Sequence, residues 1–592
     1  MGWLQTIDPL HNFFLSAAAS LLPVLFIFWA LIIKKMRGYR AALMTTGLAL
    51  LLAVTAYKMP VRLAVLSVLH GSLYGLFPIC WITLNALFMF NVMVKSGQFE
   101  VIKIFLANIS PDRRLQVLLI AFSFGAFLEG TAGFATPVAI TAAMLFGMGF
   151  DPLYAAGICL IANTAPVAFG SIGIPITVGS QVSGIPEMAL SQMVGRTLPF
   201  LSAFLPFYLV VLMCGFKKSL QVWPAILVCG ISFAFFQWFC SNYLSPMLPD
   251  ILAGIASISA MLLLLKFWKP KNTWRFSHEE KDVISTGKII HTADILIALS
   301  PFIILTIMVI GWGLQPVKDR LNILGSIKFN IPFLHNAIRK ADGSGDLAQT
   351  FNINFFSAGG TAIFIAAFIS MTLIGIKFKE GIRIFIQTAK QLRYAFLTVA
   401  SILGFAYLAN NSGMSNTLAQ TLAKTGVLFP FFSPVLGWLG VFITGSDTSS
   451  NALFGQLQLK TAMSIGVDPV VTVAGNCSGG VVAKMISPQS IAIAAAAGGL
   501  IGHESKLFRF TVKHSFIMLF VISLLVIAQA YLFKWMIPKY SMITTEKTPN
   551  FSPHRFTGNH YIFMLALILF IFFVSIKMLR NRIPVSAKKT SL

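Results

Sequence analysis

The chain has 592 residues, of which 57% are hydrophobic and 11% are charged, and its mean hydropathy is +0.81. Soluble domains carry roughly 25% charged residues, so this composition excludes a water-soluble globule. The net charge of +25 does not indicate nucleic-acid binding, because the basic residues gather in short segments between apolar runs. Such segments are typical of the cytoplasmic loops of membrane proteins and of contacts with anionic lipid headgroups.

Apolar stretches long enough to cross a bilayer recur along the chain. A helix that crosses the hydrocarbon core needs about 20 apolar residues. The clearest candidates, in chain order, are residues 14–33, 199–214, 251–265, 295–312, 359–376, 515–536 and 561–577. Together with regions in which Gly and Pro interrupt the apolar run, they predict an all-α polytopic membrane protein of about 12–14 transmembrane helices. Residues 1–592 are predicted to form a single transmembrane transporter domain.

The charged segments between the spans predict the topology. The first span is not a cleaved signal peptide, because it lacks a positive n-region and its apolar core is longer than roughly 7–15 residues. Basic loops are expected in the cytoplasm, which places the amino terminus outside and the carboxyl terminus, after a last helix at 561–579, inside. The basic segments are 34–40, 266–292, 377–394, 503–514 and the tail after Lys577. The mixed segments 315–354 and 537–560 are predicted to lie outside.

Several kinds of chemistry are not indicated. Six cysteines are scattered along the chain without a CxxC pair, so the sequence predicts no disulfide framework, no metal site and no cofactor. The Walker lysine of nucleotide-driven pumps and the HExxH and GxSxG motifs of hydrolases are also absent from the sequence. The protein is therefore predicted not to be an enzyme, and an ion gradient is the expected source of energy.

Two regions, 115–180 and 435–495, are rich in Gly, Ala, Ser, Thr, Asn and Pro rather than Leu and Phe. Both contain an acid, an Asp-Pro dipeptide 22 or 21 residues later, an asparagine, and a proline 12 residues after the asparagine. These residues are Glu129, Asp151-Pro152, Asn163 and Pro175 in the first region, and Asp447, Asp468-Pro469, Asn476 and Pro488 in the second. The shared order predicts two repeat halves, approximately 63–265 and 356–536, although four anchor points also fit a chance similarity.

Paired Gly- and Pro-interrupted apolar segments point to the binding site of a transporter. A helix that breaks inside a membrane leaves N–H groups free at one end and C=O groups free at the other, and lipid cannot satisfy them. These groups must face protein or a water-filled cavity, and the N-terminal end attracts anions. Broken or re-entrant segments in both halves are therefore predicted to form a polar pocket.

Each region contains one isolated acid. Glu129 lies in AFLEGTAGFATPVAIT (126–141), and Asp447 lies in VFITGSDTSSNALFGQ (441–456). A carboxylate at bilayer depth costs roughly 2.5–3.5 kcal/mol, so such acids usually face a cavity and have a function. Two alternatives stay open. Glu129 can be a structural acid paired with a Lys or Arg of a neighbouring helix, and Asp447 can belong to a helix N-cap.

The role of other isolated polar residues also stays open. Lys484 can counter Asp447, contact an anionic substrate, or extend to the membrane interface, and the sequence does not rank these three roles. Asn163 and Asn476 can hold helices together, which is the commoner role of buried amides.

Long runs of the sequence carry a family resemblance. These runs are GAFLEGTAGFATPVAIT, LYAAGICLIANTAPVAFGSIGIPI, FFSPVLGWLGVFITGSDTSSNALFGQLQ, MISPQSIAIA and ESKLFRFTVKHS. They resemble the bacterial lactate permease family, which includes L-lactate and glycolate permeases. The resemblance implies a symporter of the bacterial inner membrane that carries protons with L-lactate and related 2-hydroxymonocarboxylates such as D-lactate and glycolate. The expected partners are this small substrate, H⁺ and membrane lipid, with no nucleic acid.

A lactate anion is repelled by an ionised Glu129 or Asp447, because like charges interact strongly in a low dielectric. Protonating one acid removes the repulsion, so proton and substrate promote each other's binding. The two acids are therefore the predicted proton-coupling residues. The predicted substrate-binding residues are Gly130, Thr131, Gly133, Thr136, Asn163, Thr164, Gly445, Ser446, Thr448, Ser449, Ser450, Asn476, Lys484, Ser487 and Gln489.

Two other functions remain as alternatives. A sodium-coupled carboxylate carrier uses the same kinds of groups, because carboxylates, hydroxyls and unwound carbonyls also bind Na⁺. A membrane-embedded enzyme with Glu129 and Asp447 as a dyad is the alternative from another class, but no motif of such an enzyme is present in the sequence.

Overall fold

A computed structural model of the chain describes residues 2–34, 36–133, 136–276, 292–341, 345–498, 500 and 503–542. The predicted helix at 561–579, the apolar stretch at 561–577 and most of the predicted loop at 266–292 lie outside these residues.

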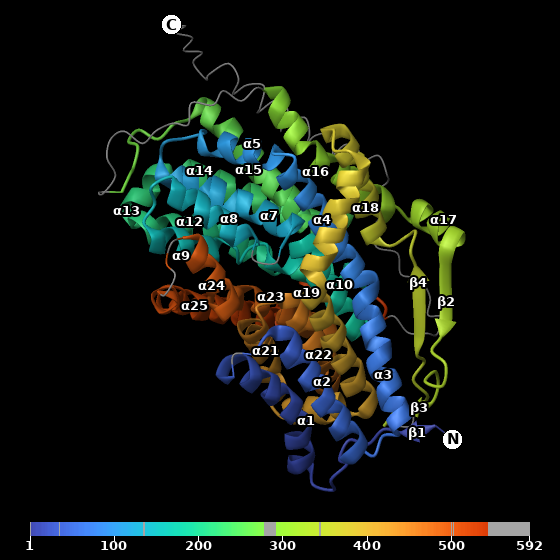
Figure 1. Ribbon diagram of the computed structural model, residues 1–592. Coiled ribbons are helices and arrows are strands. Elements are labelled where there is room, and N and C mark those ends of the chain that lie inside the picture. The colour runs from blue at the N-terminus through green and yellow to red at the C-terminus, as the bar shows by residue number, and fades with distance from the viewer. Residues whose placement is uncertain are drawn as a thin grey trace, which may run out of the picture.

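Helices dominate the described chain (Figure 1). Within it, twelve segments are long and apolar enough to cross a membrane, or up to thirteen if a bent pair counts as one span. The predicted all-α polytopic fold of about 12–14 spans is therefore confirmed.

The helices follow one another in chain order. In the first half of the chain they are α1 (Phe13–Phe28), α2 (Gly38–Thr55), α3 (Val61–Tyr74), α4 (Trp81–Lys95), α5 (Gln98–Ala107), α6 (Arg113–Gln116), α7 (Gly125–Thr131), α8 (Thr136–Gly147), α9 (Pro152–Ala162), α10 (Gly170–Ser183), α11 (Glu187–Val194), α12 (Leu198–Cys214), α13 (Phe216–Ser219), α14 (Trp223–Phe239) and α15 (Pro249–Phe267). In the second half they are α16 (Thr292–Gly313), α17 (Gln315–Gly325), α18 (Gly359–Ile374), α19 (Phe378–Ser412), α20 (Met414–Ala423), α21 (Phe429–Thr444), α22 (Asp447–Ile465), α23 (Pro469–Ala483), α24 (Pro488–Ala497) and α25 (Glu504–Tyr531). Short π or 3₁₀ segments continue some of them, including η3 (Val117–Phe124), η4 (Val167–Phe169), η6 (Cys240–Leu244) and η8 (Lys484–Ile486).

Each of the two polar regions begins with a helical hairpin. In hairpin one (113–147), α8 folds back along α7 and η3. In hairpin two (429–465), α22 folds back along α21, and the Ser450 hydroxyl donates to the Gly437 carbonyl at 3.0 Å. Glu129 lies just before the reversal of hairpin one, and Asp447 lies just after the reversal of hairpin two.

Each hairpin is followed by an Asp-Pro-capped helix that breaks. The Asp151 carboxylate accepts the Leu153 N–H at 2.9 Å at the start of α9, and the Asp468 carboxylate accepts the Val470 N–H at 3.0 Å at the start of α23. A proline at the first helical position needs no N–H partner, so Asp-Pro is a favourable helix start. The first helix breaks after Ala162, where Pro152–Ala162 and Val167–Ser183 meet at 63°. The second continues through η8 and is interrupted at Ser487, whose backbone is extended, before α24 begins.

The two polar regions pack against each other reciprocally. Helix α10 of the first region packs on α22 of hairpin two, and α24 of the second region packs on α8 of hairpin one. The Asn451 amide on α22 donates to the Pro175 carbonyl on α10 at 3.0 Å. A further similarity between the halves is that α5 in the first and α20 in the second each start directly after a glycine in the left-handed conformation, Gly97 and Gly413. This reciprocal packing supports an internal duplication, while the boundaries 63–265 and 356–536 stay predictions.

Two basic segments that were expected to be loops are helical. Residues 378–394 lie in α19, and residues 504–514 lie in α25. At 1.5 Å per residue the 35-residue α19 is about 52 Å long, which exceeds a hydrocarbon core of about 30 Å. The prediction of loops was wrong, because Lys and Arg are good helix formers and a helix can continue beyond the membrane boundary.

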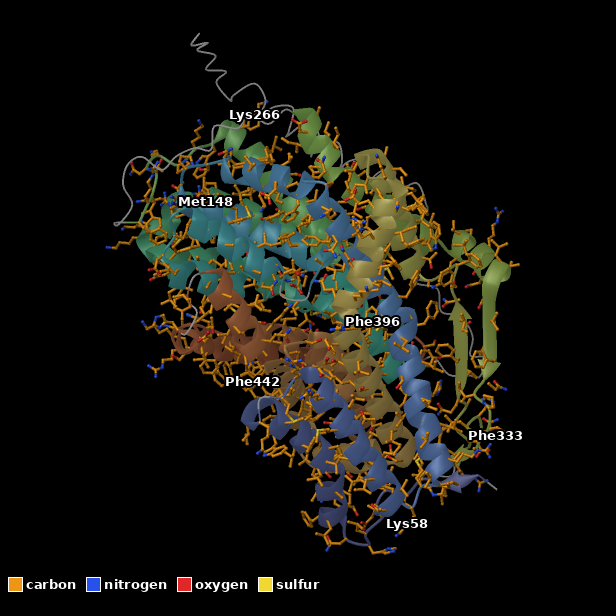
Figure 2. All side chains as sticks on the ribbon, viewed as in Figure 1. Lys58, Met148, Lys266, Phe333, Phe396 and Phe442 are labelled. Atoms are coloured by element: carbon orange, nitrogen blue, oxygen red, sulfur yellow. The ribbon has the colours of Figure 1, made fainter. Side chains whose placement is uncertain are left out.

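The segment 315–354 was predicted to be an external loop, and it contains regular structure. Besides α17 it forms β2 (Ser326–Asn330) and β4 (Thr350–Asn354), an antiparallel pair along one edge of the molecule, while β1 (Trp3–Leu4) pairs in parallel with β3 (Ile338–Arg339) (Figure 1). Figure 2 shows Lys58 and Phe333 at the end of the molecule opposite Lys266.

A close approach of α21 and α23 predicts which glycines the fold requires. A Cβ on Gly479 would lie 2.0 Å from the Pro434 carbonyl oxygen, whereas a Cβ on Gly47 would meet nothing within 4 Å. Overpacking a tight contact costs about 1–3 kcal/mol. We expect Gly479→Ala to lower the melting temperature of the detergent-solubilised protein, and Gly47→Ala to leave it unchanged or raise it. Equal melting temperatures for the two variants would contradict this account of the packing.

Candidate functional site

Glu129 connects three separate elements of the fold. Its side chain is buried, Oε1 accepts from the Lys484 ammonium at 2.5 Å, and Oε2 accepts from the Asn163 amide at 3.0 Å. Hairpin one supplies the acid, the break after α9 supplies the amide, and η8 supplies the base. The site therefore lies where the reversal of hairpin one meets the ends of α9 and α23.

Glycines make room for this contact. A Cβ on Gly170 would lie 2.6 Å from Glu129 Oε1, and a Cβ on Gly133 would lie 1.8 Å from Ser171 Oγ. The Ser171 hydroxyl itself donates to the Ala132 carbonyl at 3.3 Å. The break before α10 and the end of hairpin one are thus in direct contact, and side chains at either glycine would separate them.

The break has an unusual backbone. Ser171, Ile172 and Gly173 have φ values of 49°, 59° and 73°, so three consecutive residues are left-handed. This conformation is costly for Ser and especially for a β-branched Ile. A Cβ on Gly173 would lie 2.3 Å from the Pro246 carbonyl oxygen. Strained backbone of this kind persists where the surrounding packing imposes it, and it gathers at functional sites.

Asp447 lies buried in the first turn of α22. The residue that caps α22 is Ser446, whose Oγ accepts the Ser449 N–H at 3.3 Å. Asp447 therefore follows the N-cap as the first residue of the helix and is not the capping residue itself. Asp447 is 3% exposed, and neither carboxylate oxygen makes a hydrogen bond to another described residue. A Cβ on Gly480 would lie 2.1 Å from Asp447 Oδ1, so that glycine leaves room for the acid.

Lys484 has a direct partner that none of its three predicted roles named. Its ammonium binds Glu129, which is the pairing anticipated by the structural alternative for that acid. The residue is 8% exposed, so the predicted extension to the membrane interface is wrong. Lys484 also attracts Asp447, although no ion pair forms between them within 4 Å. The ion pair of Lys484 in the described chain therefore joins η8 to hairpin one.

Several predicted substrate-binding residues lie in or next to the elements that carry Glu129 and Asn163. Gly130 and Thr131 are buried in α7, and Thr136 begins α8. Asn163 Oδ1 and Thr164 Oγ1 are buried and make no hydrogen bond to the described residues. Both are therefore buried acceptor atoms that no described residue satisfies.

Other predicted residues are used by the protein itself. The Ser450 hydroxyl links α22 to α21 within hairpin two, and Ser487 caps α24 by accepting the Ser490 N–H at 3.2 Å. The Asn476 amide group donates to Asn451 at 2.8 Å and accepts from Gln458 at 3.1 Å, which is the helix-joining role left open for it.

The remaining predicted residues lie at the reversal of hairpin two. Gly445 has φ +69°, and Ser446 and Thr448 are half-buried. Gln489 is exposed, and a Cβ on Gly445 would lie 2.6 Å from its Oε1. Hairpin two therefore contacts the start of α24, as hairpin one contacts the break before α10.

One acid that lies at the site was not identified from the sequence. Asp250 is fully buried in the first turn of α15, beside Gly130, and neither of its oxygens makes a hydrogen bond to another described residue. Its surroundings, LPDIL, look like an ordinary helix start, and the predicted span began one residue later at 251. An acid within an otherwise apolar stretch was the available signal.

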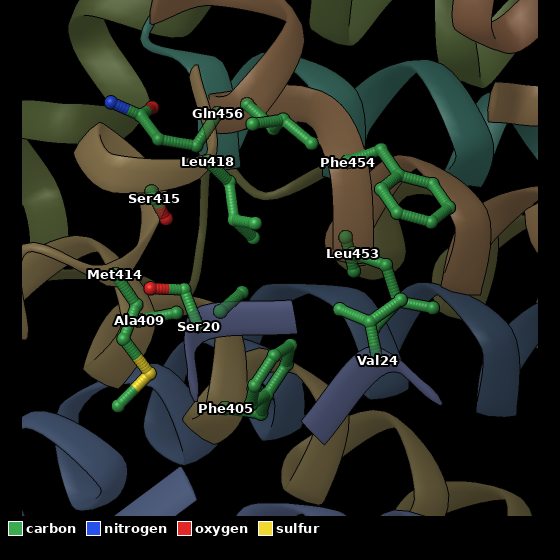
Figure 3. A pocket seen from close by; sticks show the side chains of 13 residues that line it. Ser20, Val24, Phe405, Ala409, Met414, Ser415, Leu418, Leu453, Phe454 and Gln456 are labelled. Atoms are coloured by element: carbon green, nitrogen blue, oxygen red, sulfur yellow. The ribbon is translucent and has the colours of Figure 1, made fainter. Parts of the chain in front are cut away.

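A pocket elsewhere does not suit an anion. It lies between α1, α19, α20 and α22 (Figure 3). Its lining includes the polar residues Ser20, Ser415 and Gln456 but no charged residue, and it contains none of the predicted site residues. In the described part of the chain no group of three or more His, Cys, Asp or Glu side chains is arranged to hold a metal ion.

Broken helices that enclose buried ionisable groups in a multi-span helical protein define the class of membrane transporters. A family model described as L-lactate permease matches residues 16–533. The chain is 52% identical to an L-lactate permease of Bacillus subtilis over 91% of its length and 100% of the relative, and 48% identical to the glycolate permease GlcA of Escherichia coli over 90% and 99%. The chain therefore belongs to the L-lactate permease family, and it is a multi-pass membrane protein.

A solved structure gives only a weak match. Neisseria gonorrhoeae MtrF, described as illuminating a class of antimetabolite efflux pumps, aligns with 79% of this chain and 85% of its own at 13% identity and a TM-score of 0.42. This similarity is too low to support an inference.

The buried ion pair makes a prediction about stability. Removing one partner of such a pair leaves an unpaired charge and costs about 3–5 kcal/mol, whereas replacing both partners is far less costly. We expect Lys484→Met to lower the melting temperature strongly at neutral pH, and Glu129→Gln/Lys484→Met to restore most of it. The single variant should recover as the pH is lowered, because protonation of Glu129 removes the unpaired charge.

The exposed pair of Lys103 and Glu100 provides the control. Glu100 is 63% exposed, so Glu100→Gln is expected to change the melting temperature little. A double variant no more stable than Lys484→Met would show that the ion pair is not what the site requires.

Proposed function

We propose that the protein is a secondary transporter that takes up L-lactate and related 2-hydroxymonocarboxylates, including D-lactate and glycolate, together with protons across the bacterial inner membrane. The names of the close relatives support the substrate class. The observation that carries the coupling is the buried contact of Glu129 with Lys484. We also propose that the amino terminus lies outside the inner membrane and that the carboxyl terminus lies in the cytoplasm.

Coupling follows from competition for one ammonium group. While Glu129 is ionised it occupies Lys484, and a second carboxylate is repelled. When Glu129 takes up a proton, its attraction for Lys484 falls and the ammonium can bind the substrate carboxylate. One proton and one anion then enter together, so the net charge of the site does not change. A site of unchanged charge is the least costly to move through a low-dielectric interior.

Asp447 acts in the same exchange as the second proton-coupling acid. Its carboxyl group is buried without a hydrogen-bond partner in the described chain, so its ionised form is expensive. Because Lys484 attracts it, an ionised Asp447 would compete with the substrate for the same base. At a stage of the cycle where the single transported proton is on Asp447, this competition is absent and the anion can approach the start of α22.

The 2-hydroxyl group is expected to bind beside Asn163. The Asn163 side chain donates to Glu129 with its nitrogen, and its oxygen makes no hydrogen bond to the described residues. This oxygen can accept from a substrate hydroxyl, whereas both ends of the Asn476 amide are already engaged. Alternating access would come from movement of one repeat half against the other.

The test of coupling uses purified protein in proteoliposomes with an imposed pH gradient. We expect wild-type protein to accumulate labelled L-lactate, and Glu129→Gln and Asp447→Asn each to lose at least tenfold of this accumulation, because neither neutral side chain can release a proton. Replacing external sodium by choline at fixed pH is the control and should change nothing. Accumulation by both variants at the wild-type level would refute the coupling, and dependence on sodium would favour a sodium-coupled carrier.

Competition by unlabelled acids tests the hydroxyl contact. Glycolate and D-lactate should compete with labelled L-lactate, whereas propionate, which is lactate without the hydroxyl, should compete about tenfold less well. A buried acceptor left without its donor costs about 1–3 kcal/mol. Asn163→Ala is expected to remove this preference, and an equal potency of propionate and L-lactate in the wild-type protein would contradict the contact.

A further inference from the structure

Asp250 is fixed beside hairpin one by close helix packing. A Cβ on Gly130, the residue after Glu129, would lie 2.8 Å from the Asp250 Cβ. One turn further along α15, a Cβ on Gly254 would lie 2.8 Å from the Cβ of Phe127. Helix α15 therefore runs against α7 with almost no space between the two backbones, which places Asp250 next to the residue that follows Glu129.

The groups that face Asp250 include a single cation that is already engaged. The ionisable groups are Glu129 from α7, Lys484 from η8 and Cys240 from η6, and the Gln237 amide faces it from α14. Asp250 repels Glu129 and attracts Lys484. The Lys484 ammonium is bound to Glu129, so within the described chain no further base is placed to neutralise Asp250.

The neighbouring amide does not replace a counter-ion. Gln237 donates to the Ala165 carbonyl at 2.9 Å and accepts from the Ser202 hydroxyl at 2.7 Å. Asp250 is 0% exposed, and its two oxygens make no hydrogen bond within the described ranges. An ionised carboxylate in this position would lie away from the surface, with a neutral amide from Gln237 as its neighbouring donor and no free cation, while it faces a second negative charge. Asp250 is therefore stable next to an ionised Glu129 only when it carries a proton.

We propose that Asp250 is the proton relay of the site, which holds a proton while Glu129 is bound to Lys484 and transfers it to Glu129 when a substrate carboxylate takes the ammonium. This proposal rests on the proposed function. In the transfer, the O–H bond of Asp250 breaks and an O–H bond forms on Glu129, while the electron pair stays on Asp250. Asp250 then takes up a proton from solution. The sum is one proton and one anion bound, with Asp250 returned to its first state.

The relay accounts for an acid that binding alone does not require. Lys484 and Asn163 already suffice to hold Glu129 or a substrate carboxylate. If Asp250 had only a packing role, the isosteric Asp250→Asn would leave every step of transport intact, because it keeps the shape and the polarity of the side chain. A relay instead requires a group that binds and releases a proton, which Asn cannot do and Glu can.

The experiment separates proton transfer from substrate binding in proteoliposomes with purified protein. Exchange of external labelled L-lactate for internal unlabelled L-lactate at equal pH needs binding and alternation but no net proton movement. We expect Asp250→Asn to retain exchange within about twofold of wild type and to lose at least tenfold of the accumulation driven by a pH gradient. Asp250→Glu should restore part of that accumulation.

Each outcome decides between defined alternatives. If Asp250→Asn accumulates L-lactate at the wild-type level, the relay alone is overturned. The relay is also overturned if Asp250→Asn and Asp250→Glu both lose exchange as well as accumulation, since that result shows a packing or binding role. If the wild-type protein itself fails to respond to the pH gradient, the proposed function is wrong and the relay falls with it.

A second measurement needs no variant. A hydrophobic carbodiimide reacts with protonated carboxyl groups in apolar surroundings, and peptide mass spectrometry locates the adduct. In substrate-free wild-type protein at neutral pH, the relay predicts modification of Asp250 and little modification of Glu129. Modification of Glu129 with Asp250 unmodified would overturn the assignment even if the Asp250 variants fail to fold.

Discussion

The cost of a charge in the membrane interior is the constraint on which this structure depends. Glu129 and Lys484 are stable there because each neutralises the other at 2.5 Å and because the Asn163 amide completes the site. Neither residue can be removed alone without leaving the opposite charge unpaired. The same constraint supplies the chemistry, since a proton or an organic anion can enter this pair only by changing the partner of one of its members.

Helix breaks allow that pair to form. A continuous helix would satisfy its own backbone and present only side chains, whereas the irregular start of α10 brings Gly170 and the left-handed residues 171–173 against the reversal of hairpin one. In the second region, η8 at the end of α23, just before the extended Ser487, brings Lys484 to the same point. The reciprocal packing of α10 on α22 and of α24 on α8 holds these pieces together. Small residues are needed at the contacts, because backbones meet there with no space for a Cβ.

Much of the architecture was predictable from local sequence. Apolar length predicted the spans, the Asp-Pro dipeptides marked the starts of α9 and α23, and Glu129 and Asp447 were singled out because each is alone in its segment. Local sequence failed where a residue's role depends on what lies across the fold. The partner of Lys484 is 355 residues away in the chain, and Asp250 looks like part of an ordinary helix start until α15 is packed against Gly130.

The sequence by itself determined that this is a polytopic helical membrane protein with two interrupted polar regions and an isolated acid in each, because hydrophobic length and the punctuation by Gly, Pro and Asp are local properties. Only the tertiary structure decided that Lys484 of the second region pairs with Glu129 of the first, that Asn476 joins helices while Asn163 binds Glu129, and that a third acid lies beside the first. The physical reason is that electrostatic energy depends on distance in space, and helix packing brings together charges that the chain keeps hundreds of residues apart.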